Sequence, residues 1–383
     1  MTPSGQQQQP AILHLGLHIG FAGGIERYAW QTAQTLAAHG IHNDYAGSIP
    51  SRDPKRFADA FRRILTPAQA LDANPDDYHL VILHKLCPSH TLRQLRQTFG
   101  ERLVFLAHDH DLHCARRHYY TPLGRLSCHE PRSLLPCTLC ALLSHPRNWQ
   151  RSPLETSRLL DELRHHRAIV LSSFMRDCLV RNGFSPADIT VIHPFAIPAP
   201  TPRTDFLPNG QLRLLFAGQL IRGKGADLLL EALARLNVPW TLTLAGDGPE
   251  RPRLEQQAQH LGLADRIAFT GWLQELRQLH QNADLLIVPS LWQEPFGLVG
   301  LEAAANGLPA IAFDVGGIPE WLHDGHNGIL VPERDTDALA GAIARCHDWP
   351  DMLASMSANA IRLVQEQFSV QQFVNAYAQL LHP

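Results

Sequence analysis

Two carboxylates stand at the beginning of an otherwise apolar stretch, EPFGLVGLEAAANGLPAIA, at residues 294–312. Glu294 follows the strand-like segment ADLLIVPS, and Glu302 comes after the first turn of a predicted helix. The backbone N–H groups around Gly297 and Leu298 open this helix, where unbonded donors and the helix macrodipole favour a phosphate group. Glu294 and Glu302 can accept hydrogen bonds from hydroxyl groups beside that phosphate. The pattern therefore fits a sugar nucleotide, and solvated helix-end carboxylates are the alternative.

A glycine pair, Gly23 and Gly24, follows the first apolar segment and opens the helix-like stretch GGIERYAWQTAQTLAAHG. Glycine lets the backbone approach a ligand closely, and the helix start again favours an anion. Glu26 and Arg27 are near enough in sequence to line the same turn. We expect Gly23 and Gly24 to contact substrate, with a plain strand-to-helix turn as the alternative.

The segments that must position these residues alternate between buried strands and amphipathic helices in both halves of the chain. The first half contains the strand-like segments AILHLGLHI, HLVILHKL, RLVFLAHD, RAIVLSS and DITVIHP; the second contains LRLLFAG, WTLTLAGDG, RIAFTGW, ADLLIVPS, LPAIAFD and NGILVP. Continuous apolar strands between helices predict parallel sheets that are covered on both faces. The sequence thus predicts an α/β protein with two doubly wound, Rossmann-like domains, and ligands at strand carboxyl ends facing an interdomain cleft.

Four prolines in IPAPTPRTDFLPNG predict a linker between the two halves. The amphipathic segment SVQQFVNAYAQLLHP near the C-terminus predicts a helix that can pack back on the first domain. The predicted organisation is a disordered tail at 1–10, an N-terminal domain at 11–196 with a cysteine-containing loop at 110–150, a linker at 197–210, a C-terminal domain at 211–365 and a C-terminal helix at 366–383.

The composition excludes several classes of protein. No apolar run reaches the ~18 to 20 residues of a membrane span, and MTPSGQQQQP lacks the pattern of a secretory signal. The net charge is −3, with 21 Lys and Arg against 16 Asp and Glu up to residue 200, and 12 against 20 after it. A nucleic-acid-binding protein would be more basic and carry a recognisable module. The basic first half fits ordinary solvated helices, and it also fits contact with an anionic membrane or substrate.

Seven cysteines in a long chain fit a reducing cytosol better than a disulfide framework. Cys114, Cys128, Cys137 and Cys140 nevertheless lie in one proline- and arginine-rich loop, and the last two form a C-x2-C pair. A structural zinc ion at these four residues would help to fold the loop, but zinc sites more often use two close pairs. Reduced, unpaired thiols are the favoured interpretation.

The stretch PSLWQEPFGLVGLEAAANGLPAIAFDVGGIPEWLHDGHNGILV resembles the signature of the retaining family 4 glycosyltransferases, which have the GT-B fold. That signature has two glutamates separated by seven residues, then a glycine-rich turn and a Gly-Ile/Leu-Leu-Val strand. Further segments follow the family's order along almost the whole chain: GGIERYAWQTAQTLAAHG, FLAHD, FAGQLIRGKGADLLLEAL, LAGDGPERPRLEQ and FTGW. Each is only moderately specific alone, and the resemblance rests on all of them.

The resemblance implies that Lys224, in GQLIRGKGADLLLEAL, binds the diphosphate of a donor. Gln219 stands where the family usually has an arginine, and we expect Arg222, three residues further on, to supply the missing charge. His108 follows a predicted strand and matches a family histidine that contacts the donor sugar. Asp109 beside it either holds an acceptor hydroxyl or orients the loop.

The resemblance also assigns substrate contacts in the second half. Phe296, Gly297 and Leu298 are expected at the diphosphate, and Gly271 and Trp272, in FTGW, where the nucleotide base packs. The C-terminal domain would then bind the nucleotide sugar, and the N-terminal domain would face the acceptor.

The reaction that the resemblance implies is a retaining transfer of a sugar from a nucleoside diphosphate sugar to a hydroxyl of a glycan or lipid-linked acceptor. Cell-envelope polysaccharide or lipopolysaccharide synthesis is the expected setting, in the cytoplasm or on the cytoplasmic face of the inner membrane. Glu294, His108 and Lys224 are the expected catalytic residues, and no cofactor is expected to be required. A phosphorylase, a sugar-nucleotide epimerase and a non-catalytic interaction protein are the alternatives. Phosphate dependence would reveal the first, and a changed sugar without an acceptor the second.

Overall fold

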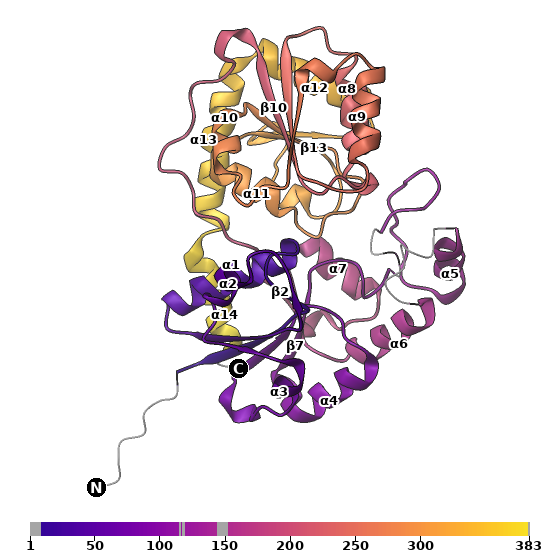
Figure 1. Ribbon diagram of the computed structural model, residues 1–383, viewed down its shortest axis with the longest axis vertical. Coiled ribbons are helices and arrows are strands. Elements are labelled where there is room, and N and C mark those ends of the chain that lie inside the picture. Colours follow the sequence, from indigo (N-terminus) through magenta and orange to yellow (C-terminus); the bar gives the residue numbers. More distant parts are fainter. Residues whose placement is uncertain (1–8, 115, 117–118, 144–151, 382–383) are drawn as a thin grey trace. The chain divides into compact units, whose positions relative to one another are not determined.

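The computed structural model describes residues 9–114, 116, 119–143 and 152–381 (Figure 1). Residues 1–8 of the expected tail lie outside the described residues. The chain forms two compact units: unit 1 comprises Met1–Arg117, Pro131–Pro194 and Val370–Pro383, and unit 2 comprises His118–Glu130 and Phe195–Ser369. Each unit contains one parallel sheet with helices, as the sequence predicts.

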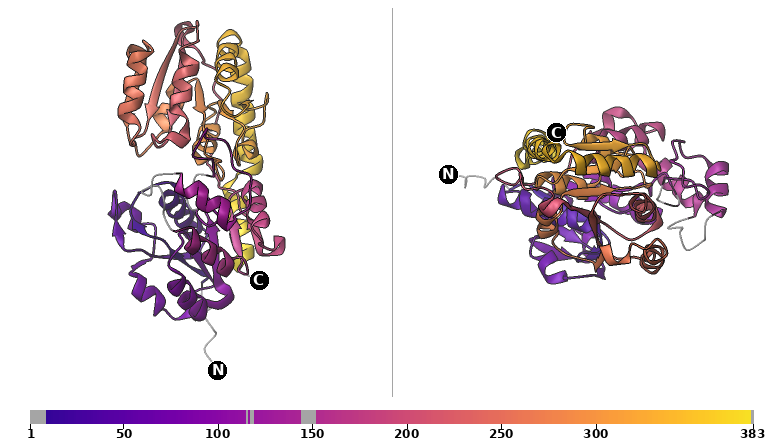
Figure 2. Two further views of the ribbon diagram at one scale, coloured as in Figure 1. Left: turned by 90° about the vertical axis from the view of Figure 1, so that its right-hand side faces the viewer. Right: turned by 90° about the horizontal axis from the view of Figure 1, so that it is seen from above.

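Unit 1 is built on a seven-stranded sheet whose order reverses in the middle, between β1 and its neighbour β6, as in a doubly wound fold. Its strands consist mainly of buried aliphatic residues because helices cover both faces (Figure 2). In spatial order the strands are β5 (Arg63–Leu65), β3 (His42–Ala46), β1 (Ala11–Leu15), β6 (Leu80–Leu83), β7 (Leu103–Ala107), β8 (Ala168–Val170) and β9 (Ile189–Val191); β2 (His18–Ile19) and β4 (Ile49–Pro50) form a separate pair.

The helices of unit 1 come from both ends of the chain. The C-terminal segment forms the last of them, α14, which packs on the first, α1; the hydroxyls of Tyr28 and Tyr377 are 3.2 Å apart. The helices are α1 (Gly24–Ala38), α2 (Pro54–Ala58), α3 (Pro67–Leu71), α4 (Ser89–Phe99), α5 (Leu134–Leu142), α6 (Pro153–Leu163), α7 (Ser173–Arg181) and α14 (Val370–Leu381).

Unit 2 is built on a six-stranded parallel sheet of the same kind. In spatial order its strands are β12 (Ile267–Gly271), β11 (Trp240–Ala245), β10 (Leu212–Ala217), β13 (Leu285–Val288), β14 (Ala310–Phe313) and β15 (Gly328–Val331). Its helices are α8 (Ala226–Leu233), α9 (Arg251–His260), α10 (Arg277–Asn282), α11 (Leu298–Ala305), α12 (Thr336–Asp348) and α13 (Pro350–Gln367). Throughout the described part of both units, no helix has the length and apolar character needed to cross a membrane.

The boundaries of unit 2 differ from the predicted domain in two places. Residues 118–130, expected in the N-terminal domain, belong to unit 2 because Arg125 forms an ion pair of 2.8 Å with Asp227. The proline-rich segment 197–210 also packs on unit 2, where the N–H of Ala199 donates to the carbonyl of Ala305 over 2.7 Å. Prolines lack a backbone N–H and so disfavour sheet pairing in this segment, but its other residues can still form backbone hydrogen bonds.

Candidate functional site

Lys224 and Glu294 meet at the centre of unit 2. Strands β10 and β13 are neighbours, and the strand order reverses between them. In a doubly wound sheet, ligands bind outside the carboxyl ends of the strands at this switch point. The loop after β10 carries Lys224 and the loop after β13 carries Glu294, and Lys224 Nζ lies 2.6 Å from Glu294 Oε1. Two residues 70 positions apart thus form one site at the expected place.

The position of Glu294 is set by its own loop and by a glycine-rich turn. Ser290 Oγ donates to Glu294 Oε1 over 2.8 Å, and the N–H of Gly317 donates to the Glu294 carbonyl over 2.7 Å. Gly316 has a φ of +61°, and a Cβ there would lie 2.4 Å from the same carbonyl oxygen. The glycine pair in DVGGIPEW therefore lets this turn pack directly against the backbone of Glu294.

Lys224 is held by a second glycine contact. Gly225 has a φ of +68°, and a Cβ there would lie 1.8 Å from the carbonyl oxygen of Pro289. The ammonium group of Lys224 is also 5.2 Å from the ring centroid of Trp292, within the range of a cation–π interaction. Arg222, two residues earlier, is exposed to solvent. The turn thus carries two cations: Lys224, which contacts Glu294 and Trp292, and Arg222, which is exposed to solvent.

Helix α11 begins beside this pair and has no side chain capping its first turn. Gly297, the residue before the helix, has a φ of +92° and makes no capping hydrogen bond, and Leu298 is partly exposed. The side chain of Phe296, which is expected at the diphosphate, is 1% exposed and packs on Phe368 with ring centroids 5.5 Å apart. Its carbonyl accepts the indole N–H of Trp321 over 2.7 Å.

The other predicted contacts of unit 2 lie along the same sheet edge. Gly271 ends β12 with a φ of +74°, and its carbonyl accepts the N–H of Gly246 over 2.8 Å. Trp272 follows and is 44% exposed. Strand β12 is two positions from β10, which corresponds to about 10 Å across the sheet. Glu302, on α11, is partly buried.

In unit 1, the predicted glycine pair opens α1. Gly23 precedes the helix with extended backbone and no side-chain cap. Gly24 is the first helical residue, and a Cβ there would meet no atom within 4 Å. The structure thus leaves space at this helix start. Glu26 is 7% exposed, so its side chain belongs largely to the interior of this turn.

His108 directly follows β7 and is partly buried. Its Nε2 is 2.8 Å from His84 Nδ1, and its ring makes an edge contact with Tyr28 at 5.1 Å. Burial lowers the pKa of His108 to about 3, so the imidazole is neutral at physiological pH.

Asp109 is part of a buried charge cluster with Lys85 and Asp111. Lys85 Nζ lies 3.0 Å from Asp109 and 2.7 Å from Asp111, and the N–H of Asp111 donates to Asp109. Burial opposes ionisation of Asp109, but the charge of Lys85 and these hydrogen bonds hold its pKa below the usual range. Burial and the charge of Asp109 raise the pKa of Asp111 to about 7. Of the two roles expected for Asp109, these contacts support orientation of the loop.

The second half of the chain matches a known family. Residues 202–363 match Glycosyl transferases group 1. This group 1 segment contains Lys224, Glu294, Glu302 and the start of α11. The chain is 33% identical over 162 residues to alpha-D-kanosaminyltransferase of Streptomyces kanamyceticus, and this alignment covers 41% of this chain and 42% of the relative. It is 35% identical over 207 residues to glycogen synthase of Mycobacterium tuberculosis, covering 53% of this chain and 47% of the relative. The chain thus matches less than half the length of each.

Solved structures match the chain over nearly its whole length. HepE of Anabaena, in complex with UDP and glucose, superposes with a TM-score of 0.74 at 19% identity, over 97% of this chain and 99% of that one. Sucrose-phosphate synthase of Thermosynechococcus elongatus superposes with a TM-score of 0.71 at 23% identity, over 97% and 98%. At these identities the similarity concerns the fold, and it confirms the predicted GT-B architecture beyond the group 1 segment.

Sequence reasoning did not find the short segment that supports the Glu294 loop. Gln293 Nε2 donates to the carbonyls of Tyr119 and Cys128, over 2.7 Å each. Gly223, in the Lys224 turn, faces Tyr120: a Cβ there would lie 3.1 Å from its ring. Residues 119–130 therefore support the loops that carry Lys224 and Glu294.

The zinc alternative at Cys114, Cys128, Cys137 and Cys140 stays a prediction. Among the described residues, His110, His113 and Cys178 bring their ligand atoms within 4.8 Å of one another. His110 Nδ1 is 3.0 Å from His113 Nε2, and Arg181 donates to Cys178 Sγ over 3.2 Å. The positive charge of Arg181 disfavours a metal cation beside this thiol, so we assign the cluster no ligand.

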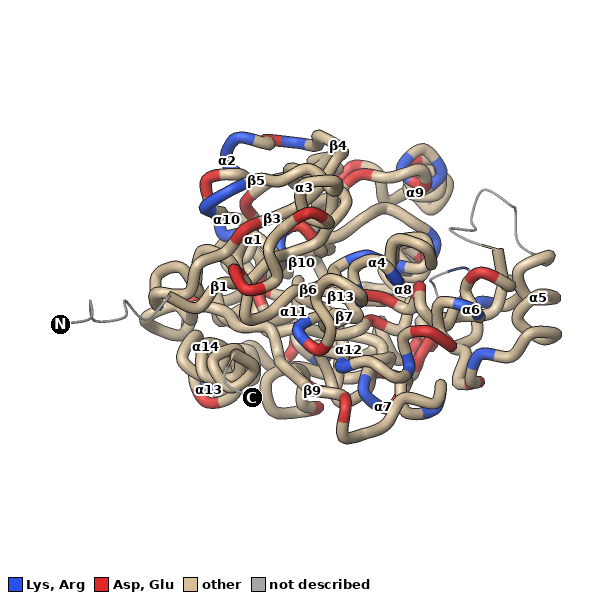
Figure 3. Tube along the Cα trace, turned by 90° about the horizontal axis from the view of Figure 1, so that it is seen from below, with Lys and Arg blue, Asp and Glu red and all other residues tan. Residues whose placement is uncertain are grey.

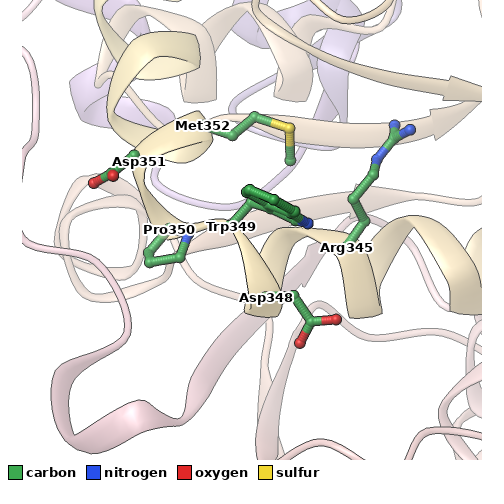
Figure 4. A pocket seen from close by; sticks show the side chains of 6 residues that line it. All are labelled: Arg345, Asp348, Trp349, Pro350, Asp351 and Met352. Carbon is green, nitrogen blue, oxygen red and sulfur yellow. The ribbon is translucent and has the colours of Figure 1, made fainter.

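A separate hollow lies at the corner between α12 and α13 (Figure 4). Its lining contains none of the predicted site residues and includes the exposed indole of Trp349. Its lining residues are Arg345, Asp348, Trp349, Pro350, Asp351 and Met352.

Proposed function

We propose that the protein transfers a sugar, with retention of configuration, from a nucleoside diphosphate sugar to a hydroxyl group of a glycan or lipid-linked acceptor. The observation that carries this proposal is the contact of Lys224 with Glu294 at the switch point of unit 2, beside the uncapped start of α11. The family match of residues 202–363 and the UDP and glucose held by the similar HepE structure support it.

The diphosphate would bind where cations and free N–H groups are together. Lys224, Arg222 and the backbone N–H groups at Gly297 and Leu298 would share its charge, with Arg222 standing in for the arginine that Gln219 replaces. These groups would stabilise the negative charge that develops as the diphosphate leaves, by electrostatic preorganisation. In this mechanism no metal ion is required, and the departing phosphate takes the proton of the attacking acceptor hydroxyl on the same face of the sugar.

Glu294 would exchange one partner for another during binding. In the structure its Oε1 accepts from Lys224 and Ser290. A diphosphate would draw the ammonium group of Lys224 toward itself, and a sugar hydroxyl would then take the place of that donor at Glu294. Glu302 would accept from the ribose, and Gly271 and Trp272 would pack the base about 10 Å away across the sheet edge.

Unit 1 would supply the remaining substrate contacts. His108 would contact the transferred sugar, and Gly23 and Gly24 would leave the backbone close to a ligand. Asp109 would orient the loop of His108 through Lys85. A cell-envelope glycan or lipopolysaccharide intermediate is our proposed acceptor.

We further propose that unit 1 rests on the cytoplasmic face of an anionic membrane through α5. This helix carries no charged residue (Figure 3), and Leu135, Leu139 and Leu142 are 62–76% exposed. A nearby hollow is lined by Arg132, Arg164 and Arg181, with Asp161 as its acidic residue. Apolar side chains beside arginines suit the headgroup region of an anionic bilayer.

Vesicles test this contact directly. The protein should sediment with vesicles that contain phosphatidylglycerol, and the double variant Leu135→Ser, Leu139→Ser should sediment several-fold less. A matched change on an exposed leucine of unit 1 away from α5, Leu17→Ser, should have no effect. Equal sedimentation of all three proteins would disprove the contact.

The proposed activity is tested first by ligand binding and then by one variant. Among UDP, GDP and ADP, with and without glucose attached, one nucleotide should raise the melting temperature in EDTA, because a ligand stabilises the state that binds it. Lys224→Ala should remove this shift, whereas Arg235→Ala, a surface change in the same unit, should keep it. Glu294→Ala should retain the fold and lose sugar transfer by at least a hundredfold. An active Glu294→Ala protein would overturn the assignment.

A further inference from the structure

A row of four polar side chains crosses the sheet of unit 1 and ends at His108. Asn43 lies on β3, His14 on β1, and His84 and His108 directly follow β6 and β7, and these strands are neighbours in that order. Asn43 Oδ1 is 2.9 Å from His14 Nε2, His14 Nδ1 is 2.8 Å from His84 Nε2, and His84 Nδ1 is 2.8 Å from His108 Nε2. The planes of the three imidazoles differ by 21° and 20° at the two steps, and the ring centroids are 5.1 Å apart at each step.

The strand register explains why this row is continuous. Asn43 lies opposite the residue two before His14, and His14 lies opposite the residue two before His84. The register of β6 with β7 gives the same step from His84 to His108. Because side chains alternate between the faces of a strand, a step of two keeps every member on one face of the sheet.

Asn43 determines the direction of the hydrogen bonds. Its Nδ2 donates to the carbonyls of Ala33 and Ile41, over 3.2 and 2.8 Å. Two carbonyls require the amide nitrogen on that side, so the amide oxygen faces His14 and accepts its Nε2–H.

The remaining roles then follow one by one. His14 Nδ1 has the lone pair and accepts from His84 Nε2–H. His84 Nδ1 accepts in turn from His108 Nε2–H. A neutral imidazole has a single N–H, so His108 Nδ1 is left as an acceptor.

This direction holds only while the imidazoles are neutral, since an imidazolium donates through both nitrogens. His14 and His84 are at most 2% exposed. Burial lowers the pKa of His14 to about 4 and that of His84 well below its usual value. The charged groups nearest the row are Asp44 beside His14 and Asp109 and Lys85 beside His108.

We propose that Asn43, His14 and His84 are positioning residues that hold His108 in its Nε2–H tautomer, so that Nδ1 accepts a hydrogen bond from a hydroxyl of the transferred sugar. The sugar contact rests on the function proposed above. The site then selects donors that present a hydroxyl to His108, and a deoxy sugar at that position leaves Nδ1 without its donor. Because the row itself needs no ligand, its effect on His108 is measurable in the free protein.

The first test is the tautomer itself. Long-range ¹H–¹⁵N spectra of protein with ¹⁵N-labelled histidine, with His108 assigned through His108→Gln, should show a protonated Nε2 and an unprotonated Nδ1 at pH 7.5. His84→Gln, whose amide can both donate and accept, should preserve this tautomer, and His84→Phe should produce a mixture. Tyr78→Phe removes a buried hydroxyl that donates to Asp44 in the same sheet and should leave the tautomer unchanged. A protonated Nδ1 in the wild-type protein would overturn the proposal even if His84→Phe does not fold.

The second test is kinetic and uses glucose release from UDP-glucose, GDP-glucose and ADP-glucose. His84→Phe should lower kcat/KM at least tenfold, and His84→Gln should recover to within about threefold of wild type. Equal losses in both variants would mean a merely structural role and would contradict the proposal. If the wild-type protein has the expected tautomer but turns over no donor, the proposed activity is disproved. A wrong tautomer would instead disprove the positioning role of Asn43, His14 and His84.

Discussion

His14 illustrates how one buried side chain links stability to pH. It is fully buried between Asn43 and His84. Burial lowers its pKa from 6.5 to about 4, against the opposing effects of Asn43 and Asp44. His14 is therefore protonated near pH 6.5 in the unfolded chain but only near pH 4 in the folded chain.

This difference predicts that stability is lost as the pH falls. Each depressed imidazole contributes a slope of at most about 1.4 kcal/mol per pH unit below pH 6.5. Between pH 7 and 5, urea unfolding of the wild-type protein should therefore show a loss about 2 kcal/mol larger than that of His14→Gln, which can keep both hydrogen bonds. Identical pH dependence in the two proteins would show that His14 is protonated in the folded state.

At the scale of elements, the turn after β14 packs against the loop after β13 and contacts the backbone of Glu294. Gly316 presses against the backbone of Glu294 and cannot hold a Cβ without displacing it. Gly325 has a similar φ, +71°, but a Cβ there would meet no atom within 4 Å. Substitution of Gly325 would therefore report only the strain of a left-handed backbone, whereas substitution of Gly316 would in addition displace Glu294.

Gly316→Ala should lower sugar transfer by at least tenfold, because Glu294 must shift by a substantial part of an ångström. Gly325→Ala should lose about 1 kcal/mol of stability through backbone strain and keep its activity. Steady-state kinetics and thermal unfolding of both variants measure this. Equal activities would show that the position of Glu294 does not depend on the turn.

The elements were easier to predict than the contacts between loops. Continuous apolar runs such as HLVILHKL and ADLLIVPS indicated buried parallel strands, and the structure has β6 and β13 there. The prediction for Glu294 used its place after a strand, whereas the prediction for Lys224 came from the family resemblance. The packing of the Phe296 ring on Phe368 could not be predicted, because sequence does not show which way a loop turns its aromatic ring. The row ending at His108 depends on the register of four strands, and no pattern within one strand reveals register.

At the scale of the whole molecule, the C-terminal helix α14 belongs to unit 1, together with the N-terminal part of the chain. Phe373 and Tyr377 are buried in unit 1, and Phe373 lies 6.3 Å from the ring of Tyr28. Tyr28 in turn contacts His108. Residues from the last turns of the chain thus complete the surroundings of a residue near position 100.

Phe373→Ala should destabilise unit 1 by about 3–5 kcal/mol through loss of a buried ring. The thermal shift caused by the best-binding nucleotide should persist, since unit 2 holds Lys224 and Glu294. Calorimetry with and without that nucleotide separates the two effects. Loss of nucleotide binding together with unit 1 would show that the two units unfold as one.

The chain passes between the two units four times, near residues 118, 131, 195 and 370. A hybrid protein joined at a single point in the proline-rich segment would therefore exchange neither unit whole. It would place Gln293 and Arg222 of one parent against the 119–130 segment of the other, and it would separate α14 from the helix it packs on. Exchange of unit 2 as a whole must carry two separate pieces of chain together, and exchange of unit 1 must carry three, so changes within the loops of one unit are a simpler route to altered ligand preference than the exchange of halves.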